Sequence, residues 1–180
     1  LYGEADPAGR LPFTWPKKLE DSPSHRLATQ DLDTVNYEEE LMVGYRYFDT
    51  QEVEPQFPFG YGLSYTTFRY GRLRVSEKNS KVRGRIEIRN TGDRDGSQTV
   101  QIYVRPERPS VTRPVHELKA FEKLFLRAGE RRTVEFTLPA RAFSYYSETE
   151  GRWVEDPGPY TIEAAASSRD IRSTAQIDIK

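Results

Sequence analysis

The stretch QFPFGYGLSYTTF, residues 56–68, decides how this chain is organised. It sets Phe57, Phe59, Tyr61 and Tyr65 among two glycines and a proline. Glycine lets two backbones approach closely, proline fixes a turn, and aromatic rings bury a large area. The stretch therefore predicts a clamp between a β-domain on its C-terminal side and a larger body on its N-terminal side, with these four aromatics as the clamp residues.

The residues after this stretch, 68–180, alternate between apolar and polar side chains. Val82, Ile86 and Ile88, for example, alternate with arginines and a glutamate, as expected of a strand with one buried face. Short strands of this kind are also predicted at residues 100–104, 118–126, 134–138, 143–147, 160–166 and 171–179. Turn residues separate most of them, and no strong helical pattern intervenes. The series predicts an all-β domain built as a β-sandwich.

The residues before the clamp divide into two further parts. Residues 1–18 contain one strand-like run in which Leu11, Phe13 and Trp15 alternate with polar or turn residues. A lone strand cannot bury such a face, so we expect it to be the last strand of a separate domain. Residues 19–67 form a long linker. We expect this linker to pack on a neighbouring body, because loops of this length are uncommon inside compact domains.

Two conformations stay open for the linker at residues 43–49, VGYRYFD. The alternation of Val43, Tyr45 and Tyr47 predicts an extended segment. Three glutamates just before it, residues 38–40, suit a helix N-terminus instead. A glycine and the density of aromatic residues favour the extended segment.

The bulk composition argues against several kinds of function. The formal net charge of −1 gives no electrostatic case for a nucleic acid or a membrane surface as partner. Without cysteine there is no disulfide framework, no thiolate nucleophile and no cysteine metal ligand. Because the sequence starts at Leu1 without a signal peptide, we expect a part or a processed form of a longer protein. The compartment stays open, with a periplasmic or secreted location favoured over the cytoplasm.

Several blocks of the sequence, in order and at plausible spacing, resemble glycoside hydrolase family 3. They are GEADPAGRLPFTWP (3–16), VGYRYFD (43–49), FPFGYGLSY (57–65), NTGD (90–93), VQIYV (100–104), ELKAFEKLFL (117–126), AGE (128–130) and PGPY (157–160). The first block resembles the end of the second catalytic domain of that family, which is an α/β sandwich. The later blocks resemble the family's C-terminal fibronectin type III-like domain. The resemblance covers nearly the whole chain.

The resemblance implies three domains or segments. Residues 1–18 would be the tail of the second catalytic domain, 19–67 a packed linker, and 68–180 a fibronectin type III-like (immunoglobulin-like) β-sandwich. It also implies a retaining, exo-acting β-glucosidase or β-xylosidase, in which an aspartate nucleophile and a glutamate acid/base lie upstream of this segment. We therefore expect no catalytic residue here and no activity of the segment alone, which would brace the catalytic domains.

The resemblance also sets the expected partners. They are the upstream catalytic domains of the same protein or a separate catalytic chain and, through them, a β-linked oligosaccharide or aryl glycoside. No nucleic acid, membrane, cofactor or metal is expected. Two alternatives stay open: a stand-alone carbohydrate-binding module, and a non-catalytic partner subunit.

One run of neighbouring residues is the candidate for contact with substrate: Tyr45, Arg46, Tyr47, Phe48 and Asp49. Sugar sites combine aromatic platforms with charged hydrogen-bonding groups, and this run supplies both. The favoured alternative is that the rings pack the linker against the catalytic body, with Arg46 and Asp49 fixing it through a salt bridge.

Two further sets of residues have a functional and an ordinary interpretation. Tyr145, Tyr146 and Trp153 would form a sugar-binding strip if exposed, but we expect them to fill the core of the sandwich. His25 and His116 have no second metal ligand at suitable spacing. We expect both histidines to be ordinary surface residues.

Overall fold

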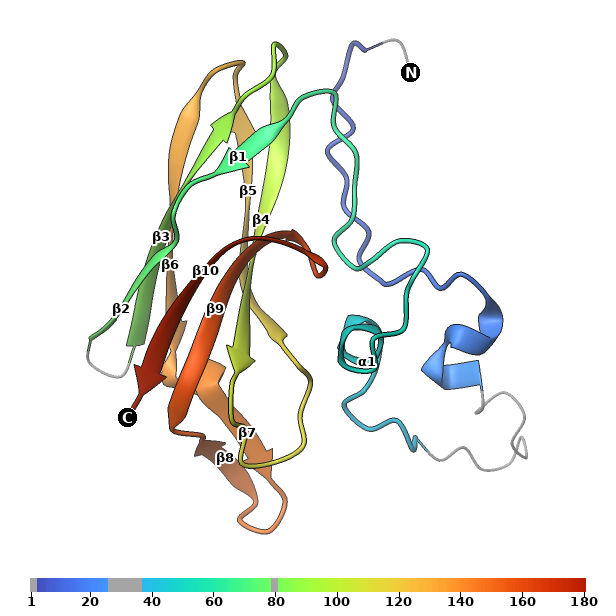
Figure 1. Ribbon diagram of the computed structural model, residues 1–180, viewed down its shortest axis with the longest axis vertical. Helices are drawn as coiled ribbons and strands as arrows, with labels where there is room; N and C mark the ends of the chain where they lie inside the picture. The colour runs from blue at the N-terminus through green and yellow to red at the C-terminus, as the bar shows by residue number, and fades with distance from the viewer. Residues whose placement is uncertain (1–2, 26–36, 79–80) are drawn as a thin grey trace.

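The computed structural model describes residues 3–25, 37–78 and 81–180. Two antiparallel sheets pack face to face, and the N-terminal residues and a short helix lie along the outer side of one sheet (Figure 1). This arrangement confirms the predicted all-β sandwich. Residues 26–36 of the predicted linker lie outside the described residues. In the described ranges, no helix has the length and apolar character that crossing a bilayer requires.

The first sheet is centred on its longest strand, β3. Its strands are β1 (Phe68–Tyr70), β2 (Arg74–Lys78), β3 (Lys81–Asn90) and β6 (Arg131–Pro139). β3 pairs with β6 along one edge and with β2 and then β1 along the other. Val82, Ile86 and Ile88 of β3 face the core, as their alternation predicted.

The second sheet has the order β10-β9-β4-β5. Its strands are β4 (Gly96–Pro106), β5 (Glu117–Leu126), β9 (Gly158–Ser167) and β10 (Asp170–Ile179). A separate ribbon of β7 (Ser144–Ser147) and β8 (Arg152–Glu155) follows the short 3-10 helix η4 (Ala140–Phe143) at one end of the sandwich.

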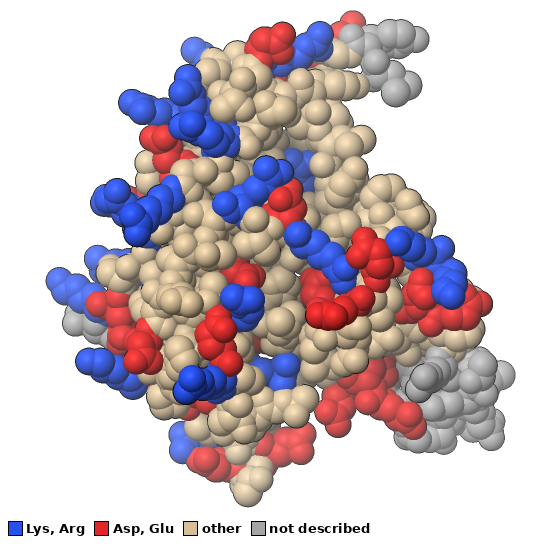
Figure 2. Space-filling view, viewed as in Figure 1, with Lys and Arg blue, Asp and Glu red and all other residues tan. Residues whose placement is uncertain are grey.

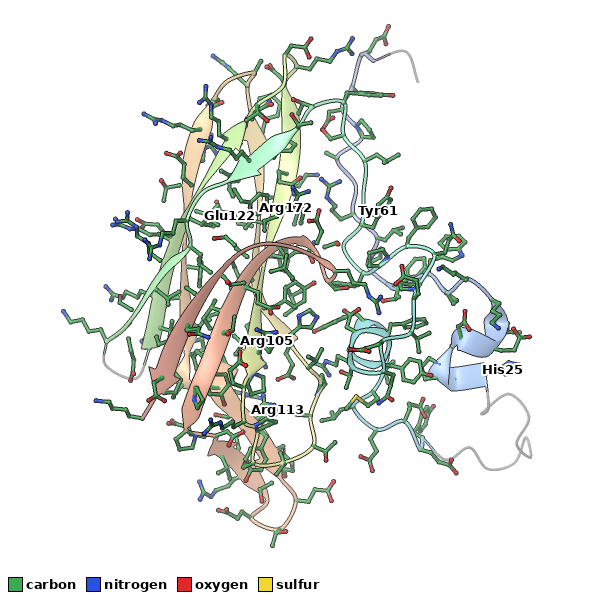
Figure 3. All side chains as sticks on the ribbon, viewed as in Figure 1. His25, Tyr61, Arg105, Arg113, Glu122 and Arg172 are labelled. Atoms are coloured by element: carbon green, nitrogen blue, oxygen red, sulfur yellow. The ribbon has the colours of Figure 1, made fainter. Side chains whose placement is uncertain are left out.

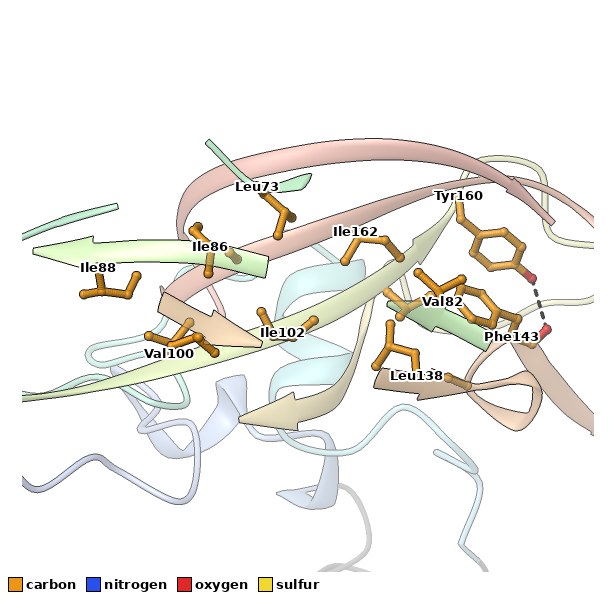
Figure 4. Close-up of a cluster of buried hydrophobic side chains, with 14 of the residues drawn as sticks. Leu73, Val82, Ile86, Ile88, Val100, Ile102, Leu138, Phe143, Tyr160 and Ile162 are labelled. Carbon is orange, nitrogen blue, oxygen red and sulfur yellow. Dashed lines mark hydrogen bonds between the residues drawn. The ribbon is translucent and has the colours of Figure 1, made fainter. Parts of the chain in front are cut away.

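The hydrophobic core lies between the two sheets (Figure 4). Tyr160 is one of its fully buried side chains. The Tyr160 hydroxyl donates to the carbonyl oxygens of Asp156 at 2.7 Å and Phe143 at 3.2 Å, a tie typical of such sandwiches. The prediction that Tyr145, Tyr146 and Trp153 fill the core is wrong: Tyr146 and Trp153 are 52% and 46% exposed, and Tyr145 is half-exposed. The reason is that they stand on the β7–β8 ribbon, while Tyr160 already fills the core position.

The linker contains helix α1 (Tyr45–Thr50), so the extended segment predicted at residues 43–49 is wrong. Gly44 precedes the helix with a φ of 58°, a value that favours glycine. Tyr45, Phe48 and Asp49 are three and four residues apart and therefore share one helix face. That face lies against the sandwich, and burying it outweighs the strand-like alternation.

The first described residues pair with the clamp rather than with either sheet. The Leu11 amide donates to the carbonyl oxygen of Tyr61 at 2.9 Å, and the Trp15 amide donates to that of Phe57 at 2.8 Å. Between the described residues of these two segments, Trp15 and Phe57 form an isolated antiparallel β-bridge. We call residues 3–18 the arm and residues 56–65 the clamp. The 3-10 helices η1 (Leu19–Asp21) and η2 (Pro23–His25) follow the arm.

Candidate functional site

The linker has an inner side that is attached to the sandwich and an outer side that is not. On the inner side, the Tyr45 ring packs on Phe59 at 5.1 Å and meets Tyr103 of β4 edge-on at 5.8 Å between ring centroids. The Leu118 amide of β5 donates to the Tyr45 hydroxyl at 2.8 Å. Tyr45 therefore joins helix α1 to the outer face of the second sheet.

His116 lies at the centre of the contact between α1 and the sandwich. Its Nδ1 is 2.8 Å from Glu163 Oε2 on β9, and its Nε2 is 3.2 Å from Asp49 Oδ2 on α1. The ring also stacks on Tyr103 at 4.6 Å. Because both ring nitrogens face carboxylates, which only accept, both carry hydrogen and the ring is an imidazolium. His116 is buried, so the prediction that it is a surface residue is wrong.

The charges around His116 support each other. Burial by itself lowers the pKa of His116, but hydrogen bonds to Asp49 and Glu163 and their charges outweigh it and raise the pKa above its ordinary value. Burial likewise raises the pKa of Asp49, but hydrogen bonds from His116 and Arg169 outweigh it and hold the pKa low. Arg105 Nε adds an ion pair to Glu163 Oε1 at 3.3 Å. The helix is therefore bound to the sandwich by alternating charges.

Arg169, between β9 and β10, holds the C-terminal end of α1 and the residues after it. Its Nε donates to Asp49 Oδ1 at 2.7 Å and its Nη1 to Glu54 Oε2 at 2.8 Å. Its Nη2 donates to the carbonyl oxygens of Phe48 at 2.7 Å and Val53 at 2.8 Å. One guanidinium thus fixes the backbone path of the linker over six residues.

The clamp glycines allow backbone contact with the sandwich and the arm. Gly60 has a φ of 81°, and a Cβ there would lie 2.2 Å from Gln101 Nε2. Gln101 cannot move aside freely, since its amide donates to Ala166 and accepts from Tyr103. A Cβ on Gly62 would lie 2.2 Å from the carbonyl oxygen of Gly9 in the arm.

Asp6 ties the arm, the clamp and β4 together. Its Oδ1 accepts from the Ser64 hydroxyl at 2.7 Å and the Tyr65 amide at 2.8 Å, and its Oδ2 accepts from the Ser97 amide at 3.1 Å. Burial raises the pKa of Asp6, but these hydrogen bonds outweigh it and keep the pKa below its usual value. The arm is therefore held on the sandwich by a carboxylate that stays ionised.

The outer side of the arm and clamp is apolar and open. Phe57 and Tyr61 pack at 4.9 Å between centroids, and Phe13 packs on Trp15 at 5.6 Å. A groove of about 400 Å³, lined almost wholly by apolar atoms, runs between Leu11, Trp15, Phe57 and Tyr61. Phe13 is 48% and Trp15 50% exposed. We call Leu11, Phe13, Trp15, Phe57 and Tyr61 the apolar face. Figure 3 shows Tyr61 on the linker beside the sandwich.

The predicted substrate-contact residues divide between the two sides of α1. Phe48 is buried, and Tyr45 and Asp49 are engaged with the sandwich. Arg46 and Tyr47 stay half-exposed, with Arg46 3.6 Å from Glu117 of β5. The salt bridges of Arg46 and Asp49 therefore bind the linker to the sandwich, and whether the run also touches a sugar stays a prediction.

The predicted clamp residues lie partly on the inner side of the linker and partly on its outer side. Phe59 faces inward onto Tyr45, whereas Phe57 and Tyr61 belong to the apolar face and Tyr65 is 43% exposed. Within the described ranges, no group of three or more acidic, histidine or cysteine residues is arranged to hold a metal ion.

Sequence reasoning missed the residues that hold the linker. His116 is 67 residues from Asp49 and 47 from Glu163, and Arg169 is 120 from Asp49. Each is a single polar residue in an ordinary local pattern. Only the folded arrangement brings them together, so no spacing rule on one sequence could have found them.

Two family models match the chain. The Glycosyl hydrolase family 3 C-terminal domain matches residues 1–65, and the Fibronectin type III-like domain matches residues 98–168. Together the two ranges span well over half of the sequence.

Curated and solved proteins match over almost the whole chain. A thermostable β-glucosidase B from Acetivibrio thermocellus is 46% identical over 95% of this chain, which spans 23% of that protein. An exo-α-(1→6)-L-arabinopyranosidase from Bifidobacterium breve is 40% identical over 100% of the chain and 24% of its own length. The crystal structure of a β-glucosidase from Bifidobacterium adolescentis superposes with a TM-score of 0.95 at 40% identity, covering 99% of this chain and 27% of that one. The chain thus spans about a quarter of the length of these relatives, at their C-terminal end.

Proposed function

Since the chain belongs to glycoside hydrolase family 3, we propose that it forms the non-catalytic C-terminal part of a retaining, exo-acting glycosidase of the β-glucosidase or β-xylosidase class. Its role is to brace the catalytic domains. The observation that carries this proposal is the apolar face, which is fixed rigidly on its inner side and uncovered on its outer side.

The apolar face fits a large partner of the same polypeptide. Exposed apolar area of this kind marks an interaction surface when it is contiguous. Trp15 and Phe57 supply aromatic anchors of the kind that dominate binding free energy. We propose the upstream catalytic domains as the partner, with residues 1–18 as the tail of the second of them, 19–67 as the packed linker, and 68–180 as the sandwich domain.

The carboxylates of this chain do not suit glycoside cleavage. A retaining enzyme needs one ionised nucleophile and one protonated acid across an open sugar site. Among the described residues, one buried pair of carboxylates is Asp49 and Glu163, but the same imidazolium lies between them and arginines bind their remaining oxygens. A second buried pair, Glu117 and Asp156, shares the guanidinium of Arg113. Asp49 is held ionised, and none of these carboxylates is free for a sugar. The nucleophile and the acid/base therefore belong to the upstream domains.

The same part of the chain serves relatives with different activities. One similar protein carries the name of a β-glucosidase and another that of an exo-α-(1→6)-L-arabinopyranosidase. We infer that the upstream domains choose the sugar and linkage, a β-linked oligosaccharide or aryl glycoside. Within the predicted run Tyr45–Asp49, contact with that substrate falls to the half-exposed Arg46 and Tyr47.

An activity assay tests this division of labour. The chain of residues 1–180 is expected to give no turnover of aryl β-glucosides above a blank without enzyme, whereas the full-length protein turns them over. In the full-length protein, Tyr47→Ala is expected to raise KM severalfold and to leave kcat nearly unchanged. Turnover by residues 1–180 alone would place catalytic groups in this segment and overturn the proposal.

A second candidate function is supported by the exposed pair on the β7–β8 ribbon. Tyr146 and Trp153 meet edge-on at 5.8 Å, and the Arg141 guanidinium lies 4.2 Å from the centre of the Trp153 ring. Exposed rings are what a carbohydrate-binding module presents to sugars. The arginine covers one face of Trp153, however, so a sugar would have only the other face. Calorimetry with soluble glucans and xylans tests it, and no heat of binding would exclude it.

A further inference from the structure

The outer face of the first sheet carries a charge pattern that the balanced composition hides. Many side chains that point away from the core are basic, most of them on β2 and β3: Arg69, Arg74, Lys78, Lys81, Arg83, Arg85, Arg89 and Arg131. On β6, Arg131 at its start is the basic one among the described outward residues. The carboxylates among them are those of Glu87 and Glu135. We call this set the basic face. Figure 2 shows Lys and Arg side chains projecting along the left margin of the molecule, where Figure 1 places β2 and β3.

The strand register places like charges directly opposite one another on this face. The pairs are Arg69 with Arg89, Arg89 with Arg131, Arg74 with Arg85, and Lys78 with Lys81. Like charges opposite each other on paired strands destabilise a sheet. Among the described side chains of the face, one ion pair is formed, from Arg131 to Glu87 at 3.8 Å. The same register sets Arg85 opposite Glu135. Basic groups still outnumber carboxylates on this face, so an anionic partner would offset the repulsion between them.

The basic face is shallow and accessible. A groove of about 620 Å³ crosses β2, β3 and β6. Its lining includes Arg74, Arg83 and Arg85, the hydroxyl residues Ser76 and Thr137, and one carboxylate, that of Glu135. The face belongs to the sheet that α1 and the clamp do not touch (Figure 1).

We propose that the basic face binds an anionic polysaccharide whose charges are uronic-acid carboxylates. Guanidinium groups pair bidentately with planar carboxylates, and the hydroxyls between them suit the hydroxyls of sugars. The charges repeat about every 4.8 Å across strands and about 6.8 Å along them, which suits a polymer with repeating charge. The described outward positions of these strands carry no aromatic or large apolar side chain. That disfavours stacking of nucleic-acid bases and insertion into a membrane.

Binding of a polymer at the basic face is separate from the bracing role, because the basic face lies on the first sheet and the linker packs on the second. It gives the sandwich domain a means of holding the enzyme near acidic polymers. The two proposals can fail separately, since covering of the apolar face does not depend on charge at the basic face.

The test is binding of the intact protein to polygalacturonate, with dextran as the neutral polymer. The protein is expected to be retarded by polygalacturonate in affinity electrophoresis at low salt and not by dextran. The triple variant Arg74→Gln/Arg83→Gln/Arg85→Gln is expected to bind about tenfold more weakly. Binding is expected to vanish at about 0.5 M NaCl, because salt screens exposed charges.

A matched variant controls for net charge. Arg108→Gln/Arg127→Gln/Arg152→Gln removes the same charge from exposed positions elsewhere and is expected to leave binding unchanged. The melting temperature of the basic-face variant is expected to stay equal or rise, because repulsion between strands is removed.

Four results would overturn the proposal. They are equal weakening by the two triple variants, equal retardation by dextran, tighter binding to single-stranded DNA or to phosphatidylglycerol vesicles than to polygalacturonate, and loss of the fold when the three guanidiniums are replaced. The last would show that these arginines serve the sheet itself.

Discussion

His116 is the side chain on which the attachment of the linker most depends. Because folding raises the pKa of His116, this residue makes the folded protein less stable as the pH rises. Stabilisation by a group whose pKa is raised on folding is complete below its unfolded pKa of about 6.5 and is lost as the pH rises through the folded pKa. Alkaline conditions should therefore loosen α1 from the sandwich.

We expect His116→Gln to lower the free energy of unfolding by about 3 kcal/mol at pH 6, because it removes the cation between Asp49 and Glu163 and leaves each of them with a single arginine. The wild-type protein should lose stability as the pH rises above about 6.5, and the variant should lose much less. Urea unfolding across that pH range measures both. His25→Gln, at a histidine away from this contact, is the control. An equal slope with pH in wild type and His116→Gln would contradict the imidazolium assignment.

At Gly60 the backbone of the clamp lies close to Gln101 of the second sheet. Gly60→Ala is expected to lower the free energy of unfolding by about 3 kcal/mol, because it adds a clash with Gln101 to the strain of a positive φ. Gly129→Ala is matched in φ, at 76°, but its Cβ would meet no atom within 4 Å. It should cost only about 1 kcal/mol. Thermal unfolding compares the two, and equal losses would mean that the contact with Gln101 adds nothing.

Among the elements, helix α1 shows where a pattern along one sequence fails. Val43, Tyr45 and Tyr47 alternate as in a strand, and the helix is too short to display its own period. What selects the helix is contact with partners far along the chain, above all Arg169. The strands of the sandwich were predictable because their alternation reports burial between two sheets of the same domain. The inner contacts of the linker were not, since they join single residues on separate elements.

Arg169→Lys tests how α1 is held. A lysine keeps the charge but cannot donate in the planar fork that reaches Asp49, Glu54 and the Phe48 carbonyl together. Hydrogen–deuterium exchange should become faster in residues 45–54 and stay unchanged in β3 and β4. Arg172→Lys, whose arginine pairs with Asp170 only two residues away, should leave exchange in the helix unchanged. Faster exchange throughout the sandwich would mean that Arg169 stabilises the whole fold instead.

At the scale of the whole chain, the apolar face is the feature that could be predicted best from the sequence. The aromatic residues of the clamp and the alternation of Phe13 and Trp15 predicted a surface in need of a partner. In the structure Phe13 and Trp15 are about half-exposed and Phe57 and Tyr61 are partly so, whereas Phe59 packs inward. His116 and Arg169, which hold the neighbouring helix α1 on the sandwich, could not be predicted, because their partners are remote in the sequence. The exposure of Trp153 was missed because a tryptophan in a sandwich is usually buried.

Replacing the anchors of the apolar face should weaken the full-length protein. Trp15→Ala and Phe57→Ala are each expected to cost about 2 kcal/mol of interdomain stability, as central aromatic contacts do. The measurement is the half-life of β-glycosidase activity on heating. Trp153→Ala, at a tryptophan of similar exposure on the β7–β8 ribbon, should leave the half-life unchanged. A similar loss for all three variants would deny the apolar face a special role.

The most direct test of the docking of this segment is hydroxyl-radical footprinting of the full-length protein, read at the two tryptophans of this segment. Trp15 and Trp153 are 50% and 46% exposed in this chain, so they should be modified at similar rates if neither has a partner. If the catalytic domains cover the apolar face, Trp15 is protected and Trp153 is modified freely. Equal modification of both tryptophans would contradict the docking of this segment on the rest of the enzyme.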